Sequence, residues 1–346
     1  MANIALTTSC NLDCSYCFAK KFRGMPQEGN IKFADFTQAV NWINSSDEPE
    51  KIGIIGGEPL MHPLFDDFME LLRMKRRCPD QPIQIFSNGI LLNEHLDSIR
   101  RAGASVAVNV NSPEDIGDTL YQKVFNNLAE CRMKGVPFGI GINLYKPMDL
   151  GFLYDIIKEF GIDSFRVGLT APNEPGKSAF DYFSMIEESY IGLVEESARL
   201  GAAAGIDCLR LPSCFYEKYE TRISNLIEKT GFDIETGQDC RHCVPVIDIT
   251  PTLHLTRCFG TLRQGLLMPM KAFRTPHDAE EFYRVNIDNI AQLIPMEEKC
   301  ESCYEKAIGG CQGGCLGFKL DRFLEAQAEL KKIISKPSKT VDVEFM

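Results

Sequence analysis

Six short apolar segments alternate with amphipathic helical patterns along the first half of the chain, and this alternation limits the folds available to it. The segments are, in order, Ile4–Thr8, Lys51–Ile55, Ile83–Phe86, Ser105–Val110, Phe138–Leu144 and Phe165–Leu169. Each is short and apolar enough to be a buried strand, and the residues between them show helical spacing. Repeated strand-then-helix units predict a parallel sheet with right-handed crossovers. The periodicity is compatible with a doubly wound sheet and with a curled, partial (βα) barrel.

The character of the chain changes after this array. A helical pattern over residues 179–204 is followed by an expected short strand at residues 208–211, and from about residue 239 cysteines and glycines cluster. Such clustering is typical of a small module organised by metal. We therefore expect a βα domain, a bridging segment, a cysteine-rich module, and a C-terminal helix with a tail. Their respective residues are 1–205, 206–239, 240–320 and 321–346.

Charge and hydropathy exclude several classes of function. The chain has 37 Lys and Arg against 48 Asp and Glu, a net charge of −11, which disfavours binding to nucleic acid or to an anionic membrane. No apolar stretch approaches the roughly 18 residues of a membrane span, and the N-terminus lacks the features of a signal peptide. We therefore expect a cytoplasmic protein. In a reducing compartment, clustering among its 14 cysteines favours metal binding over disulfides.

The first cysteine cluster follows directly on the first predicted strand. It reads Cys10-Asn-Leu-Asp-Cys14-Ser-Tyr-Cys17. Three thiolates on one loop can bind three irons of a cubane and leave the fourth iron open to a ligand. The alternative is a zinc loop, but a structural zinc site needs a fourth ligand, and the sequence has none nearby.

This spacing, with Tyr16 before the last cysteine and a strand before the first, resembles the radical S-adenosylmethionine (SAM) enzymes. The resemblance implies a partial (βα)6 TIM barrel with a C-terminal cysteine-rich iron–sulfur module. It also implies that Cys10, Cys14 and Cys17 hold a [4Fe–4S] cluster that binds SAM. Such an enzyme cleaves SAM reductively to a 5′-deoxyadenosyl radical, which abstracts a hydrogen atom from a substrate.

A glycine-rich turn follows the second predicted strand as Gly56-Gly57-Glu58-Pro59. Two glycines let a backbone approach a ligand closely, and a carboxylate can pair with an ammonium group. The segment resembles the family's GGEP motif, which implies contact with the amino group of the methionine moiety of SAM. The structural alternative is an ordinary strand-to-helix turn, for which Gly and Pro are the usual residues.

Polar residues end the third and fourth predicted strands, where ligands bind in such folds. Ser87 and Asn88 end the third strand, and Asn109 falls where the family places a residue that binds the ribose or carboxylate of SAM. With Tyr16, these residues are expected to bind the cofactor. The alternative for Asn109 is a cap for the next helix. The chain departs from the family after the fourth strand, where Asn111-Ser112-Pro113 replaces the frequent Asp-Gly.

Seven further cysteines lie in fewer than a hundred residues near the C-terminus. This number suggests one closed four-thiolate site and one three-thiolate site. The pattern resembles the SPASM extension, whose auxiliary [4Fe–4S] clusters occur in many peptide-modifying radical SAM enzymes. The resemblance assigns one auxiliary cluster to Cys240, Cys243, Cys258 and Cys315. It assigns a second to Cys300, Cys303 and Cys311, with the fourth site open or filled from elsewhere.

The match to SPASM is incomplete. The segment from Ile249 to Cys258 resembles the SPASM hairpin that delivers one ligand, but Leu253 stands where the pattern has Gly. The spacing between Cys303 and Cys311 is longer than usual, and no cysteine follows Cys315. One alternative is a split zinc site built from the two C-x2-C pairs. Another is a reduced module with a single auxiliary cluster.

The resemblance implies a peptide substrate, modified by crosslinking, oxidation or epimerisation, as in the maturation of ribosomally made peptides. It also implies an external electron donor such as ferredoxin or flavodoxin. Because the first predicted strand begins at residue 4, we expect no peptide-recognition domain before it. The alternatives are radical dehydrogenation of a small metabolite such as a sugar, and a non-enzymatic iron–sulfur carrier or zinc module.

Two isolated cysteines, Cys208 and Cys214, lie between the two predicted domains. Either thiol could act catalytically by donating a hydrogen atom to a substrate radical, or could ligate the second auxiliary cluster. The alternative is inert packing, the usual state of a buried free cysteine.

Overall fold

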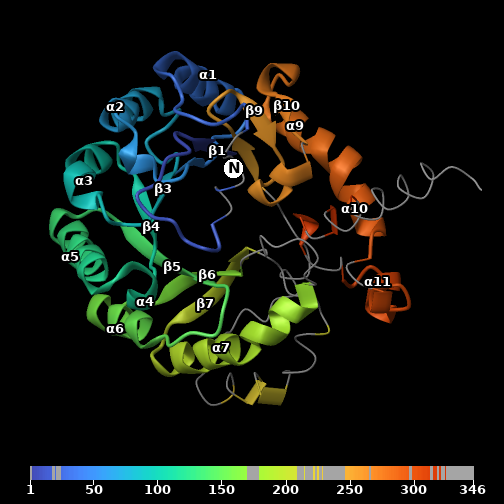
Figure 1. Ribbon diagram of the computed structural model, residues 1–346. Helices are drawn as coiled ribbons and strands as arrows, with labels where there is room; N and C mark the ends of the chain where they lie inside the picture. The colour runs from blue at the N-terminus through green and yellow to red at the C-terminus, as the bar shows by residue number, and fades with distance from the viewer. Residues whose placement is uncertain are drawn as a thin grey trace, which may run out of the picture.

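The computed structural model describes residues 2–17, 20, 25–169, 179–208, 214, 221–222, 224–225, 228, 246–264, 266–295, 298–311, 315–317, 319–320 and 324. Within them, ten strands form one sheet in the order β10-β9-β8-β1-β2-β3-β4-β5-β6-β7. Strands β1 to β7 are parallel and neighbours in chain order. Figure 1 shows them as a curved row with the helices α1 to α7 around the outside. The fold is therefore a partial barrel and not a doubly wound sheet, which confirms the expected class.

Seven strands and seven helices of the described residues build this barrel. The strands are β1 (Ala2–Ala5), β2 (Ile52–Ile55), β3 (Ile83–Ser87), β4 (Ser105–Asn109), β5 (Phe138–Leu144), β6 (Ser164–Leu169) and β7 (Ala203–Cys208). The helices are α1 (Phe33–Ile43), α2 (Phe65–Lys75), α3 (Leu92–Arg101), α4 (Pro113–Ile116), α5 (Asp118–Lys134), α6 (Gly151–Phe160) and α7 (Ala179–Arg199).

Two regions differ from the sequence prediction by more than one residue. Strand β1 ends at Ala5, earlier than expected, and Thr7 forms only an isolated bridge to Asn30. Helix α7 ends at Arg199 and the next strand begins at Ala203, so the predicted helix to residue 204 is too long and the strand comes too late. The reason is Gly201, whose φ of +74° is left-handed and ends the helix. Residues 209–211 of the predicted strand lie outside the described residues.

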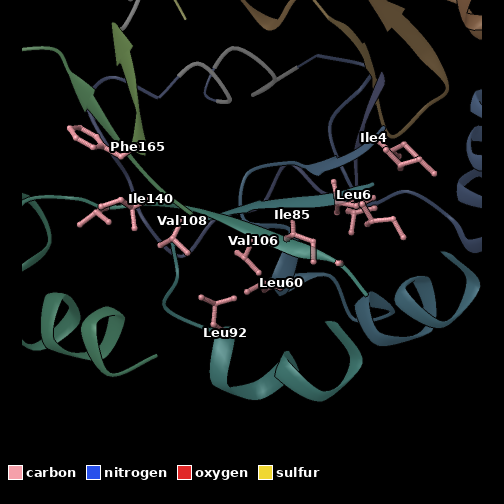
Figure 2. Close-up of a cluster of buried hydrophobic side chains, with 14 of the residues drawn as sticks. Ile4, Leu6, Leu60, Ile85, Leu92, Val106, Val108, Ile140 and Phe165 are labelled. Carbon is pink, nitrogen blue, oxygen red and sulfur yellow. The ribbon is translucent and has the colours of Figure 1, made fainter. Parts of the chain in front are cut away.

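The main core lies between the sheet and the outer helices. Alternate residues of β3 are buried, so Ile85 faces the helices while Phe86 faces the inside of the barrel. Figure 2 shows Leu60, from the short helix after β2, and Leu92, from α3, directed towards Val106 of β4. This packing leaves the inner face, and the loops at the carboxyl ends of the strands, for polar side chains.

The C-terminal part continues the same sheet. Strand β8 (Ile247–Ile249) pairs in parallel with β1, and β9 (His254–Thr256) returns antiparallel beside it. Strand β10 (Met268–Pro269) then pairs with β9. The hairpin expected before Cys258 is therefore present. Leu253, in its turn, has a φ of +56°, the left-handed conformation for which glycine is the usual residue.

Three further α-helices follow within the described residues. They are α9 (Pro276–Tyr283), α10 (Asn289–Leu293) and α11 (Tyr304–Ala307). Figure 1 places α9 beside the β8–β10 strands and α11 beyond the end of α10. The C-terminal helix expected from residue 321 lies outside the described residues except for Leu324. No helix in the described part of the chain is sufficiently long and apolar to cross a membrane.

Candidate functional site

The three N-terminal cysteines lie on the loop that leaves the carboxyl end of β1. The amide of Cys17 donates a hydrogen bond to the carbonyl of Cys14 at 3.1 Å, and the amide of Leu12 donates to the Cys10 sulfur at 3.4 Å. Cys10 is exposed, whereas Cys14 and Cys17 are partly buried. The three thiols are close enough to interact electrostatically. The loop therefore holds the three thiols near one another, and their role as cluster ligands stays a prediction.

The donor set of this loop fits a cubane, because three thiolates can each bind a different iron of the cluster. Among the described residues, no group of three His, Cys, Asp or Glu side chains is positioned to hold a single metal ion. Burial, with Glu58 and the two neighbouring thiols adding to it, raises the pKa of Cys10 to about 11. Because a ligand thiol must lose its proton, cluster cations are needed to hold it as a thiolate.

The glycine-rich turn after β2 lies against the cysteine loop. The amide of Gly57 donates to the carbonyl of Thr7 at 2.7 Å, and the amide of Glu58 donates to the carbonyl of Ser9 at 2.8 Å. A Cβ on Gly57 would lie 2.3 Å from the Ser9 oxygen, and one on Gly56 would lie 2.5 Å from the Thr7 oxygen. The close backbone approach inferred from these glycines is thus an approach to the cysteine loop itself.

Glu58 is completely buried beneath this turn. Its carboxylate accepts hydrogen bonds from the Ser87 hydroxyl at 2.9 Å and the Asn88 amide at 2.8 Å, both at the end of β3. It also accepts one from the amide of Leu60 at 3.2 Å, in the short 3-10 helix Pro59–Met61. Burial raises the pKa of Glu58 to about 7, although the three donors act against it. Its expected contact with the SAM amino group stays a prediction.

The end of β3 also contacts the cysteine loop. The Asn88 amide nitrogen Nδ2 donates to Asn11 Oδ1 at 2.7 Å and approaches the Cys10 sulfur at 3.9 Å. Glu58 holds the backbone of Asn88 from the other side. These hydrogen bonds therefore join the ends of the first three strands into one edge.

A chain of amides extends this edge across β4 and β5. The Tyr16 hydroxyl donates to Asn111 Oδ1 and accepts from Asn109 Nδ2 at 3.0 Å. Asn143 Nδ2 donates in turn to Asn109 Oδ1 at 2.7 Å, and the Tyr16 ring lies 4.6 Å from the ring of Tyr145. The predicted residues Tyr16 and Asn109 are brought together, and the Cys14 sulfur lies 3.8 Å from Asn111 Oδ1.

Sequence reasoning missed two polar residues on the inner face. Asn143, on β5, completes the amide chain, and Arg166, on β6, lies over the Phe86 ring with its guanidinium carbon 4.8 Å from the ring centre. Each stands in a strand whose neighbours in sequence are apolar or glycine. A polar residue between apolar neighbours in a predicted strand is the sequence signal that could have identified both residues. Such a side chain, when buried, needs a ligand or another polar group as its partner.

The described C-terminal cysteines form two groups. The amide of Gly260 donates to the Cys258 sulfur at 3.2 Å, and a Cβ on Gly317 would lie 2.9 Å from the Gly260 carbonyl oxygen. Cys258 and the buried Cys315 therefore lie on segments in direct contact. The other group, around α11, comprises Cys300, Cys303 and Cys311.

The structure describes only part of the other cysteines that the sequence predicts to be ligands or hydrogen-atom donors. Cys240 and Cys243 lie outside the described residues. Cys208 is the last residue of β7, but its side chain lies outside the description, and Cys214 is exposed. The hydrogen-atom donor role of Cys208 and Cys214 stays a prediction.

The cysteine loop lies at the carboxyl edge of a partial barrel, an arrangement that suits an enzyme with an iron–sulfur cluster. Sequence comparison agrees, because the model of the Radical SAM superfamily matches residues 4–149. The match and the fold together support a radical SAM enzyme with a [4Fe–4S] cluster and SAM as cofactors.

Curated relatives share part of the chain. It is 24% identical over 256 residues to a GTP 3′,8-cyclase of Sulfurimonas denitrificans, covering 69% of this chain and 74% of the relative. It is 31% identical over 127 residues to a GTP 3′,8-cyclase of Chlorobaculum tepidum, covering 36% and 35%. Several such matches span less than half of the relative's own length.

Solved structures match nearly the whole fold. The structure of native anSMEcpe with bound AdoMet has a TM-score of 0.64 at 14% identity, covering 96% of this chain and 98% of that one. Streptococcus suis SuiB bound to S-adenosylmethionine has a TM-score of 0.58 at 15% identity, covering 91% and 72%. At these identities the likeness is one of fold.

Proposed function

We propose that this protein cleaves SAM reductively and uses the resulting radical to abstract a hydrogen atom from a peptide substrate. The observation that carries the proposal is the edge at which the Cys10–Cys17 loop, the Gly56–Pro59 turn and the amide chain of Tyr16 and Asn109 meet. When bound, the cluster supplies the electron for cleavage of the SAM sulfonium to methionine and a 5′-deoxyadenosyl radical.

The chain's own residues contribute orientation. The Gly57 and Glu58 amides fix the cysteine loop, and buried Glu58 fixes the end of β3. The neutral amides of Asn109 and Asn143 offer donors and acceptors suited to ribose hydroxyls. Cys10 is exposed, which gives an external electron donor such as ferredoxin or flavodoxin access to this loop.

One observation supports a peptide over a nucleotide. The fold matches 98% of the anSMEcpe chain, and another structure of that protein contains a bound peptide. On this proposal, the C-terminal cysteines hold auxiliary clusters that accept an electron from the substrate radical or bind the substrate.

The second candidate is a cyclase acting on GTP. It is favoured by the curated relatives, several of which are named GTP 3′,8-cyclase. The third possibility, a small metabolite such as a sugar, has the same radical chemistry but no specific observation in its favour.

Anaerobic reconstitution tests the proposal. The protein is loaded with iron and sulfide, treated with dithionite and SAM, and assayed for 5′-deoxyadenosine. The variant with Cys10, Cys14 and Cys17 all changed to alanine should form none, and the Cys78→Ala variant should match the wild type because Cys78 lies outside the site. Formation of 5′-deoxyadenosine by the triple variant would contradict the proposal.

Substrate class is then tested by stimulation of the same reaction. Peptides encoded beside the gene and GTP are added separately, and products are followed by mass spectrometry. A peptide whose mass changes in the presence of SAM supports the proposal. Conversion of GTP with no effect on any peptide would favour the cyclase and refute the peptide assignment.

A further inference from the structure

Arg166 presents a positive charge to the inside of the barrel. Its neighbours in β6, Phe165 and Val167, are buried in the core beneath the outer helices, and successive side chains of a strand point to opposite faces. Arg166 itself is only partly buried. Among the strand residues that the structure describes, it is the one lysine or arginine. This part of the sheet therefore carries a single fixed cation, and the cation lies on the inner face.

The Arg166 side chain crosses the inner face. Its guanidinium carbon lies 4.8 Å from the centre of the Phe86 ring on β3, although β4 and β5 lie between these two strands in the sheet. The inner-face positions on the way are small, namely Gly139 and Gly141 on β5 and Ala107 on β4. A Cβ on Gly139 would meet nothing within 4 Å. Small residues therefore give the side chain its path and leave the interior open.

The guanidinium lies below the edge at which SAM is expected to bind. Phe86 pairs with Ala107, which precedes Asn109 by two residues on β4, and Asn109 belongs to the amide chain of that edge. Phe86 and Asn109 are both only partly buried, and Gly139 is exposed. The inner face is therefore accessible to a ligand at this level, with the amides above it and the guanidinium below.

A guanidinium held in this way suits one carboxylate. The contact with the phenyl ring uses the flat face of the group, whereas its N–H donors lie in the plane and form a fork that matches the two oxygens of a carboxylate. One cation balances one carboxylate. The triphosphate of a nucleotide carries several negative charges and would need several cations, and the described strands supply one.

We propose that Arg166 binds a carboxylate of the substrate inside the barrel. The enzyme would thereby select peptides with an aspartate, a glutamate or a free C-terminus close to the modified residue. This inference rests on the proposed function and narrows its substrate class. The modified residue then lies between the guanidinium and the edge at Asn109, where the radical is expected to form.

Two small probes test the inference without reference to SAM cleavage. N-acetylglutamate amide carries one carboxylate, and N-acetylglutamine amide is its neutral isostere. Binding of each to the reconstituted full-length protein is measured by ligand-observed NMR at millimolar concentration. The wild type should bind the carboxylate probe about tenfold more tightly than the neutral one, as expected for hydrogen bonds between charged groups.

Three variants locate the effect. Arg166→Gln should bind both probes alike, and Arg166→Lys, which keeps the charge but not the planar fork, should discriminate less than the wild type. The matched control is Arg132→Gln on α5, because the Arg132 guanidinium carbon also lies over a ring, 5.4 Å from the centre of Phe160, but outside the barrel. This control should discriminate like the wild type.

Several outcomes would overturn the inference. One is equal binding, or no binding, of the two probes by the wild type, and another is unchanged discrimination in Arg166→Gln. Loss of probe binding on addition of SAM would assign Arg166 to the carboxylate of the cofactor. Binding of GTP that depends on Arg166, with no such dependence for the carboxylate probe, would assign it to a phosphate. If SAM cleavage fails in the wild type while discrimination depends on Arg166, the proposed function is wrong and the carboxylate site is not.

Discussion

Substitution of Gly57 by alanine should push the cysteine loop away from the glycine-rich turn and destabilise the fold. The added Cβ would lie 2.3 Å from the Ser9 carbonyl oxygen, 2.7 Å from its carbon and 2.8 Å from the Thr8 oxygen. Ordinary van der Waals contact begins at 3.4 Å, so the two backbones must separate by about 1 Å. All three atoms are backbone, so no side-chain rotation can relieve the clash.

The cost follows from packing and hydrogen bonding. Overpacking of this kind costs about 1–3 kcal/mol, and separation also weakens the 2.8 Å bond from the Glu58 amide to Ser9, worth about 1 kcal/mol. We expect Gly57→Ala to lower the free energy of unfolding by about 2–4 kcal/mol. It should also lower iron at the first site, because Ser9 precedes Cys10.

Chemical denaturation and iron analysis measure both effects. The matched control is Gly139→Ala on β5, where a Cβ would meet nothing within 4 Å. The control should be within about 0.5 kcal/mol of the wild type, with full iron, as expected of a surface substitution. A Gly57→Ala protein with wild-type stability and full iron would refute the reasoning.

Three further substitutions test the site and its support. The pKa of Glu58 is raised to about 7, against an ordinary 4.5. Between these two pH values the Glu58 carboxyl group keeps its proton in the folded protein, whereas the same group has lost it in the unfolded chain. Unfolding free energy should therefore fall by roughly 3 kcal/mol as pH rises from 4.5 to 7, relative to Glu58→Gln, and denaturation across this range would show it. Tyr16→Phe removes the hydroxyl that links two asparagines, so SAM should bind roughly 3- to 10-fold more weakly in calorimetry, with iron content unchanged. Arg257→Ala breaks a largely buried 2.9 Å pair with Asp288 and should cost roughly 3 kcal/mol in denaturation, whereas exposed Arg284→Ala should change stability by less than about 0.5 kcal/mol.

The strand array could be predicted from sequence because local apolar runs determine it. Five of the six predicted strands agree with the structure to within a residue, and the hairpin before Cys258 is also present. The misplaced end of α7 had a local signal in Gly201, which helical periodicity alone does not reveal. Strands that local apolar runs determine were therefore accessible to prediction, whereas the end of this helix was not.

Contacts between distant segments were not accessible in this way. The hydrogen bond between Tyr16 and Asn109 joins residues 93 apart, and that between Asn88 and Asn11 joins residues 77 apart. Periodicity carries no information on such pairs, because it reports only which face of an element is buried. Asn143 was missed for the same reason, since its partner lies on the adjacent strand.

Strand β1 links the parts that composition separates at residues 206–239. It has parallel neighbours on both sides, β2 from the βα array and β8 from the cysteine-rich part. The Asn3 side chain donates to Asp248 at 2.7 Å in a buried contact between these two parts. Without β8, one edge of β1 would lose its backbone partners, and Asn3 would lose this hydrogen bond. The loop that carries Cys10 follows directly from β1, so the geometry of the first cluster site depends on residues more than two hundred positions away in sequence.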